Sequence, residues 1–230
     1  MKKLKIVFMG TPSFAVPILE GLINNYNVSM VVCQPDRKKN RKGEVIKPDT
    51  KVLAEQHNIK VFQPLNLKED YQEILNENPD LIITCAYGQI LPTKILNYPK
   101  YGCINIHASL LPKYRGAAPI QWSLINGDKE TGITLMYMDE FMDTGDMIDK
   151  IKYTIKDTDD IGTLHDELSL LGGEPFEYSN QQGLAPLVKK VKAEYPDKKI
   201  VGWQHTHPGY GIFLSSYDIF IQENFYGKSI

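Results

Sequence analysis

The sequence predicts an α/β fold, in which a mostly parallel β-sheet has helices on both of its faces. Short β-branched or aromatic runs lie at residues 5–8, 28–33, 81–85 and 103–106. They alternate with segments of helical period, which is typical of βαβ units. Phe14, Ile18 and Leu22 form an i, i+4, i+8 stripe, as on a helix that covers a sheet. The composition, with 42% hydrophobic and 23% charged residues over 230 positions, agrees with an ordinary globular chain of one to two domains.

Further elements are expected along the chain from the same kinds of pattern. They are a weak helical segment at 53–57, a helix at 119–126, two strands at 131–138 and 146–153 joined by a turn at 143–146, and a helix at 163–171. Residues 36–51 are polar and basic, which predicts a long loop. The last helical pattern meets Pro175, and after Gly172-Gly173 the chain becomes polar and glutamine-rich. We therefore predict two domains, residues 1–173 and residues 174–230.

The charge of the chain is nearly balanced, with 26 Lys and Arg residues against 28 Asp and Glu residues, which gives a net charge of −2. No global positive field favours nucleic-acid binding, so a polyanionic partner would need a local basic patch. Six Lys or Arg residues between positions 37 and 47 form such a patch. A solvated loop without a partner is the alternative interpretation of this segment.

The apolar runs and the cysteines indicate a compartment. No apolar run approaches the ~18 residues that a membrane span needs, and the N-terminal segment breaks into a turn too early for a signal peptide. Cys33, Cys85 and Cys103 lie in apolar runs without CxxC spacing, as small buried residues of a reducing compartment do. We expect a cytoplasmic protein without membrane contact, and no pattern indicates an oligomeric state.

A polar pair lies at the end of the strand expected at 103–106. Asn105 and His107 are two residues apart, so they share a face near the carboxyl end of the strand, where open α/β sheets bind ligands. Asp143 lies in the expected turn 36 residues after His107. An amide donor, an imidazole that carries a proton near neutral pH and an acid suit acyl transfer to an amine. A hydrogen-bonded core histidine and an ordinary turn are the structural alternatives.

Several segments together resemble the methionyl-tRNA formyltransferase family. They are residues 10–15 (GTPSFA), 34–37 (QPDR), 86–92 (AYGQILP) and 105–112 (NIHASLLP), together with Asp143. The resemblance covers about residues 3–173 and implies a Rossmann-like fold. It also implies an enzyme of translation initiation that transfers a formyl group from 10-formyltetrahydrofolate to the amino group of initiator methionyl-tRNA. The first turn lacks GxGxxG, which agrees with a family that uses no nucleotide cofactor.

The same resemblance implies roles for individual residues. Its catalytic triad falls on Asn105, His107 and Asp143, where the first two would hold an oxyanion and the acid would favour the imidazolium. Its folate-binding signature falls on Ser109, Leu110, Leu111 and Pro112. The family's tRNA-contacting loop falls on the basic segment. The resemblance therefore implies that the tRNA phosphates are contacted by Arg37, Lys38, Lys39, Arg41 and Lys42.

The acceptor of the formyl group depends on features outside the triad. The family continues into a C-terminal β-barrel that contributes to tRNA binding, and nothing after residue 173 has its pattern. Relatives that share the three residues formylate glycinamide ribonucleotide or amino sugars. The Gly-Thr-Pro-Ser-Phe opening and the basic segment favour the tRNA enzyme over these relatives.

A second constellation lies near the end of the chain. His205 and His207 share a face if they lie on a strand, and Asp218 would be a third ligand beside a fourth position for water, as in catalytic zinc sites. Ser215 lies three residues before Asp218. The alternative is that Ser215 and Asp218 form a capping signature and that the histidines are surface residues.

Residues 175–230 resemble part of the JAMM (MPN-type) metalloprotease family, which implies zinc at His205, His207 and Asp218 and a carbonyl-assisting role for Ser215. No glutamate upstream of the histidines occupies the position of that family's general base, so we expect zinc affinity without isopeptidase activity. Three functions remain open: a formyltransferase with an unrelated tail, a zinc-dependent JAMM-type isopeptidase or peptidase, and a composite chain with no complete activity. Formyl transfer is favoured because its triad and folate signature are all present.

Overall fold

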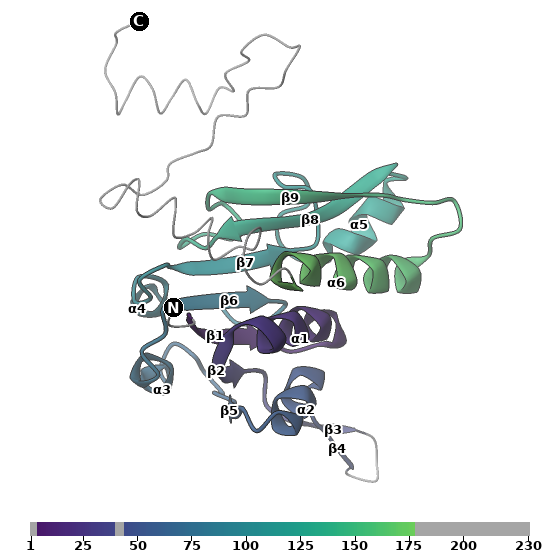
Figure 1. Cartoon of the computed structure of the whole chain (residues 1–230). Coiled ribbons are helices and arrows are strands. Elements are labelled where there is room, and N and C mark those ends of the chain that lie inside the picture. Colours follow the sequence, from purple (N-terminus) through teal and green to yellow (C-terminus); the bar gives the residue numbers. More distant parts are fainter. Residues whose placement is uncertain (1–3, 40–43, 178–230) are drawn as a thin grey trace, which may run out of the picture.

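A seven-stranded sheet forms the centre of the protein (Figure 1). The computed structural model describes residues 4–39 and 44–177. The strands of the sheet are β1 (Lys5–Gly10), β2 (Asn27–Val32), β5 (Lys60–Phe62), β6 (Leu81–Cys85), β7 (Cys103–His107), β8 (Glu130–Tyr137) and β9 (Met147–Thr154). Their order is β5-β2-β1-β6-β7-β8-β9, with parallel pairing from β5 to β7 and antiparallel pairing from β7 to β9. The sheet is therefore mostly parallel, as the sequence predicts.

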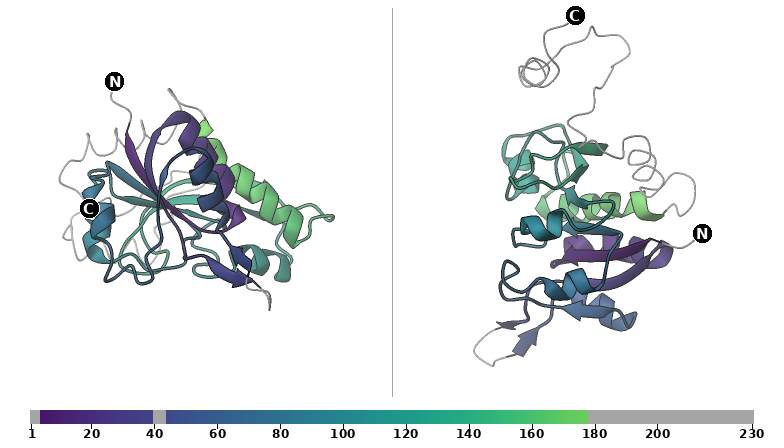
Figure 2. Two further views of the ribbon diagram at one scale, coloured as in Figure 1. Left: turned by 90° about the horizontal axis from the view of Figure 1, so that it is seen from below. Right: turned by 90° about the vertical axis from the view of Figure 1, so that its left-hand side faces the viewer.

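Helices cover both faces of this sheet (Figure 2). One face carries α1 (Val16–Asn25), preceded by the 3₁₀ turn η1 (Ser13–Ala15), and α2 (Asp49–Gln56), α5 (Pro119–Ile125) and α6 (Ile161–Glu177). The other carries α3 (Gln72–Asn76) and α4 (Thr93–Leu96). In β1, Ile6 and Phe8 join the first core cluster, whereas Val7 and Met9 join the second. This alternation is the two-residue period of a strand that is buried on both sides.

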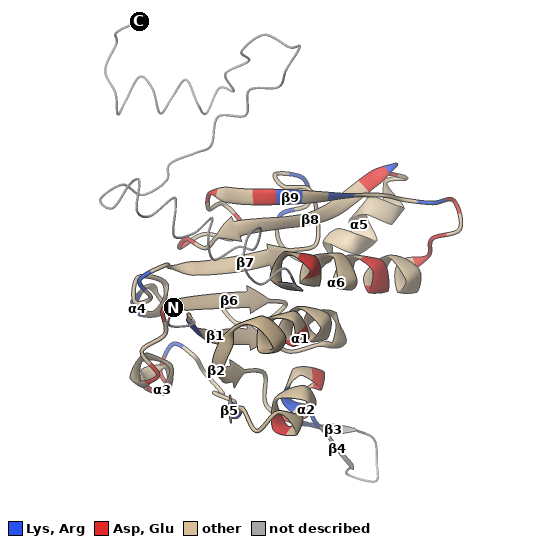
Figure 3. Ribbon diagram, in the orientation of Figure 1, with Lys and Arg blue, Asp and Glu red and all other residues tan. Residues whose placement is uncertain are grey.

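Residues 36–51 do not form the uninterrupted loop that their polar composition predicts. β3 (Arg37–Lys39) pairs antiparallel with β4 (Glu44–Ile46), and α2 begins at Asp49. The hairpin projects from the molecule beside α2 (Figure 1). Its strands carry no alternating apolar pattern because neither of them covers the core; Val45, for example, is 61% exposed. Over the described elements as a whole, basic and acidic residues are interspersed (Figure 3).

The last helix is longer than its sequence pattern predicts. α6 continues through Gly172 and Gly173 and includes Pro175, because this part of the helix packs closely against α1. A Cβ added at Gly172 would lie 3.1 Å from Ile18 Cδ1, so the small residue permits the contact. Phe176 is fully buried in the core, and its carbonyl accepts a hydrogen bond of 2.9 Å from Asn25 Nδ2. The division into residues 1–173 and 174–230 stays a prediction.

Within residues 4–39 and 44–177, each helix is too short or too polar to cross a lipid bilayer.

We predict that Gly132→Ala destabilises the fold by about 1–3 kcal/mol, the usual cost of overpacking. Gly132 lies on β8, and a Cβ there would be 2.0 Å from the backbone oxygen of Ile151 on β9, so the two strands would have to separate. Chemical denaturation measures the effect. Gly162→Ala in α6 is the matched control, because its nearest neighbour would be Asp160 Oδ1 at 3.4 Å and alanine favours helix. Equal stability of the two variants would contradict the prediction.

Asp146, in the turn between β8 and β9, makes the stability of the fold depend on pH. Burial, and to a lesser degree the negative charge of Asp139, raises the pKa of the Asp146 carboxyl from 3.8 to about 6. Between about pH 4 and pH 6 the unfolded chain therefore releases this proton while the folded chain keeps it, and stability falls as pH rises.

We predict that Asp146→Asn removes this loss of stability with rising pH, because the asparagine amide stays uncharged over the whole pH range. The melting temperature of the variant, measured relative to that of the unsubstituted chain, should rise between about pH 4 and pH 6 and stay constant above that range. A difference that does not change with pH would show that the carboxyl is not perturbed.

Candidate active site

A cleft of about 640 Å³ lies at the carboxyl ends of β6 and β7, where residues of η1, α5 and α6 also line it. Residues 84–91, 105–108, 116–121 and 138–143 form most of its walls. Asn105 and His107 line it from β7 together with Ile106, whereas Ile104 lies in the first core cluster and does not reach the cleft. Both side chains lie at the carboxyl end of the strand and line one cleft, as the two-residue spacing predicts, and ligand binding at this edge stays a prediction.

The amide of Asn105 has a fixed orientation. Thr84, its neighbour in the β6–β7 register, donates a hydrogen bond of 2.8 Å from Oγ1 to Asn105 Oδ1. The amide nitrogen therefore faces the other way, and Nδ2 lies 3.4 Å from Asp143 Oδ1. This geometry presents an N–H donor beside the carboxylate within the cleft.

The imidazole of His107 is held through one of its two nitrogens. Nε2 lies 2.8 Å from the carbonyl oxygen of Tyr114, and a carbonyl can only accept, so Nε2 carries a hydrogen. Nδ1 lies 3.5 Å from Asp143 Oδ2. Nδ1 is consequently the nitrogen that gains or loses a proton, and it does so beside a carboxylate. The residue is only 6% exposed, which keeps the imidazole in this position.

Asp143 completes the group from a strained turn. Its Oδ2 accepts a hydrogen bond of 2.8 Å from the Gly116 N–H, and its own φ is 52°. Ala86, Tyr114 and Ala118, which lie in or next to the cleft walls, also have positive φ. Non-glycine residues of this conformation are costly and cluster at functional sites. Loops that are held under strain thus bring Asp143 to the two strand residues.

The three side chains form an arrangement that suits acyl transfer. Asn105 Nδ2 and a protonated His107 Nδ1 can donate hydrogen bonds to an oxygen that gains negative charge. Asp143 can stabilise the imidazolium and accept a proton. The sequence predicts these three residues, and the structure brings all of them together.

The expected folate signature lies elsewhere. Ser109, Leu110, Leu111 and Pro112 are not among the residues that line the cleft. Ser109 is fully buried; its Oγ donates a 2.6 Å hydrogen bond to the Lys113 carbonyl, and its own carbonyl accepts one from Thr134. These contacts position the loop that carries Tyr114 and Gly116. A direct role of the signature in folate binding stays a prediction.

The basic segment lies outside the cleft but is connected to its wall. Arg37 is exposed on β3, while the side chains of Lys38 and Lys39, and all of Arg41 and Lys42, lie outside the described part of the chain. At the root of the hairpin, Gln63 Nε2 donates 2.8 Å hydrogen bonds to the Gln34 carbonyl and to Asp36 Oδ1. Gln34 Nε2 in turn donates to the Tyr87 carbonyl, at 3.1 Å, in the cleft wall.

The expected zinc site cannot be located, since His205, His207, Ser215 and Asp218 lie outside the described residues. Within residues 4–39 and 44–177, no group of three or more His, Cys, Asp or Glu residues could hold a metal ion. Zinc binding and a JAMM-type segment stay predictions.

Several contributors to the site are not predicted from the sequence. Thr84 could have been found, because it interrupts the apolar run of β6 near the strand's end, as Asn105 does in β7. The Tyr114 carbonyl and the Gly116 N–H are backbone groups, and residue type does not reveal them.

Comparison with curated proteins identifies similar sequences. Methionyl-tRNA formyltransferase of Geobacillus sp. (strain WCH70) is 48% identical over 194 residues, which cover 83% of this chain and 61% of the relative. The Bacillus subtilis (strain 168) protein of the same name is 54% identical over 173 residues, or 74% of this chain and 55% of the relative. The protein of the same name from Pelotomaculum thermopropionicum is 51% identical over 215 residues, which cover 88% of this chain and 69% of the relative. The chain thus spans little more than half of the length of the first two relatives.

Solved structures share the fold at low sequence identity. Phosphoribosylglycinamide formyltransferase from Bacillus halodurans superposes with a TM-score of 0.63 at 19% identity, covering 85% of this chain and 99% of that one. A formyltetrahydrofolate deformylase from Pseudomonas syringae pv. tomato superposes with a TM-score of 0.61 at 22% identity, covering 76% of this chain and 58% of that one.

A family model described as formyl transferase matches residues 4–176. The matched segment contains the whole seven-stranded sheet and all three converging side chains. With three quarters of its length inside this match, the chain belongs to the formyl transferase family.

Proposed function

We propose that this chain transfers a formyl group from 10-formyltetrahydrofolate to the amino group of methionyl-tRNA. The observation that carries the proposal is the convergence of Asn105 Nδ2, His107 Nδ1 and the Asp143 carboxylate in one cleft. Curated relatives at about half identity bear the name methionyl-tRNA formyltransferase, which supports this acceptor.

The cleft fits a folate co-substrate. Its volume of about 640 Å³ lies within the roughly 300–1,000 Å³ that is typical of small-molecule sites. Ile90, Phe141 and Met142 line it and are 64%, 75% and 65% exposed, so an apolar ring that covered them would be stabilised by burial. These residues would hold the co-substrate, which when bound supplies the formyl carbonyl that the amine attacks.

The residues of the cleft would act on the charges that develop in the reaction. As the amine attacks the formyl carbon, the carbonyl oxygen becomes negative, and Asn105 Nδ2 and His107 Nδ1–H donate hydrogen bonds to it. The Asp143 carboxylate, 3.5 Å from Nδ1, favours the charged imidazole and relays the proton that the amine loses. When the oxyanion collapses, the bond between the formyl carbon and folate N10 breaks, and N10 takes up this proton, so that tetrahydrofolate leaves. Thr84 and the Tyr114 carbonyl keep both donors oriented.

The β3–β4 hairpin would contact the tRNA backbone. Arg37 is exposed there, and the hydrogen bonds through Gln63 and Gln34 join the root of the hairpin to the cleft wall. A phosphate backbone bound by the hairpin would therefore extend toward the residues that act on the esterified amino acid.

We predict that Asn105→Ala lowers kcat by about a hundredfold or more, the usual effect of removing one oxyanion donor. Formation of formyl-methionyl-tRNA by the purified chain measures the effect. Asn76→Ala, which removes an exposed amide on α3 outside the cleft, is the control and should leave kcat unchanged. Turnover of Asn105→Ala equal to that of the unsubstituted chain would refute the assigned role.

We also predict that replacing Arg37, Lys38 and Lys39 together with glutamine weakens the salt dependence of tRNA binding. Each lost phosphate contact reduces the slope of log Kd against log salt concentration by about 0.7–0.9, so three contacts give a change of about 2–3. Filter binding over a range of salt concentrations measures the slope. Replacing Lys100, Lys129 and Lys152, which lie outside the hairpin, is the charge-matched control. Identical slopes for the two triple variants would exclude the hairpin as the tRNA contact.

A further inference from the structure

The residue that holds His107 through its backbone is itself held through its side chain. The Tyr114 hydroxyl donates a 2.7 Å hydrogen bond to Asp128 Oδ2 and accepts one of 2.9 Å from Asn126 Nδ2. Lys113 Nζ lies 2.7 and 2.8 Å from the two carboxylate oxygens of Asp128, and 5.1 Å from the centre of the Tyr114 ring. We call Lys113, Tyr114, Asn126 and Asp128 the Asp128 cluster.

Tyr114 needs such an anchor because of its backbone conformation. Its φ is 59°, in the left-handed region that non-glycine residues adopt only when their surroundings impose it. A relaxed Tyr114 would turn its carbonyl away from the direction of His107 Nε2. The phenol ring gives the protein a rigid connection by which this conformation can be imposed.

Asp128 is suited to be the fixed end of this connection. It lies between α5 and β8, and its N–H donates a 3.0 Å hydrogen bond to the Ser123 carbonyl. Its side chain is only 13% exposed. The hydrogen bond from Lys113, opposed by burial, lowers the pKa of the Asp128 carboxyl, so the acceptor stays ionised.

The cluster does not touch the space where substrates would bind. Lys113, Tyr114, Asn126 and Asp128 are all absent from the cleft lining, whereas His107 belongs to it. Any influence of the cluster on catalysis must therefore pass through the Tyr114 carbonyl to His107 Nε2.

We propose that Asp128 and Tyr114 are positioning residues for formyl transfer. By fixing the Tyr114 hydroxyl, Asp128 fixes the carbonyl that keeps a hydrogen on His107 Nε2 and directs Nδ1 toward Asp143. Without this anchor the neutral imidazole exchanges its two tautomers and the ring can turn, so Nδ1 is no longer held toward Asp143 and the cleft. The inference rests on the proposed function for its effect on rate, but the state of His107 can be observed directly.

The kinetic test compares Tyr114→Phe, Asp128→Ala and Asp128→Asn with the unsubstituted chain in formyl transfer. Tyr114→Phe and Asp128→Ala should lower kcat by about tenfold or more while KM for both substrates stays within about twofold, because a displaced catalytic group costs rate rather than binding. Asp128→Asn should keep more of the rate than Asp128→Ala, since its amide oxygen still accepts the hydrogen bond from Tyr114.

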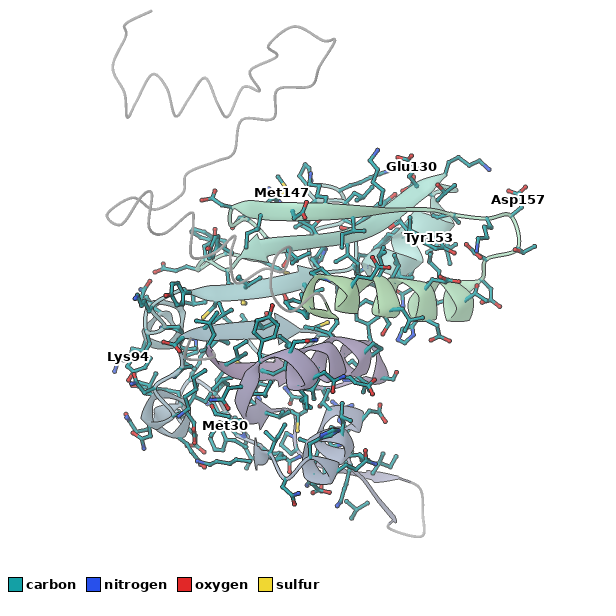
Figure 4. All side chains as sticks on the ribbon, in the orientation of Figure 1. Met30, Lys94, Glu130, Met147, Tyr153 and Asp157 are labelled. Atoms are coloured by element: carbon teal, nitrogen blue, oxygen red, sulfur yellow. The ribbon has the colours of Figure 1, made fainter. Side chains whose placement is uncertain are left out.

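A second Tyr-Asp-Lys group offers a matched control. Tyr153 Oη donates a 3.1 Å hydrogen bond to Asp159 Oδ2, and Lys156 Nζ lies 5.7 Å from the ring centre. Tyr153 lies near the C-terminal end of β9, at the other end of the strand from Met147 (Figure 4). Neither Tyr153 nor Asp159 lines the cleft. Tyr153→Phe and Asp159→Asn should leave kcat unchanged. An equal loss in the two groups of variants would mean that the effect is one of general stability and would overturn the proposal.

The tautomer of His107 provides a test that needs no activity. Nitrogen-15 NMR of the imidazoles of the full chain, with His107 assigned by its loss in His107→Gln, should show a single Nε2–H tautomer for the neutral ring of the unsubstituted chain. Tyr114→Phe should show a mixture of tautomers, and Tyr153→Phe should not. An unchanged tautomer in Tyr114→Phe would overturn the inference whatever the rates. Absence of formyl transfer by the unsubstituted chain would instead refute the proposed function and leave the NMR comparison to decide the role of Tyr114.

Discussion

The hydrogen bond from His107 Nε2 to the Tyr114 carbonyl determines what chemistry the cleft can perform. It assigns a hydrogen to one ring nitrogen and leaves the other, Nδ1, as the site of proton exchange beside Asp143. The rest of the loop serves this contact: Ser109 and Thr134 hold its beginning, and Gly116, two residues after Tyr114, binds the Asp143 carboxylate. One loop thus orients both the imidazole and its acid.

The sheet supplies the fixed frame for this loop. Parallel pairing of β6 with β7 places Thr84 beside Asn105, so a hydroxyl on one strand orients the amide on the next. Antiparallel pairing of β7 with β8 then places Thr134 opposite His107, where its hydroxyl can reach the Ser109 carbonyl. Apolar residues on the same strands point into the core between these polar ones, so the core fixes the geometry of the candidate site.

The predictable part of the protein follows from periodicity, and the unpredictable part follows from loops and backbone groups. A period of two residues predicts that Asn105 and His107 share a face, but no spacing predicts that Asp143 folds back to them from a turn with positive φ. The hairpin at β3 and β4 has no predictive apolar pattern because its strands cover no core. The helix α6 passes Pro175 because burial of Phe176 against the core outweighs a local helix breaker.

Formyl transfer at the Asn105–His107–Asp143 site is the central property proposed for this chain. The decisive measurement is transfer of a labelled formyl group from 10-formyltetrahydrofolate to methionyl-tRNA by the full chain and by its folded His107→Ala variant. We expect formyl-methionyl-tRNA with the unsubstituted chain and a loss of rate of at least about a hundredfold with the variant. Equal rates for the two proteins, or no product with a folded chain that binds both substrates, would show that this site does not transfer the formyl group.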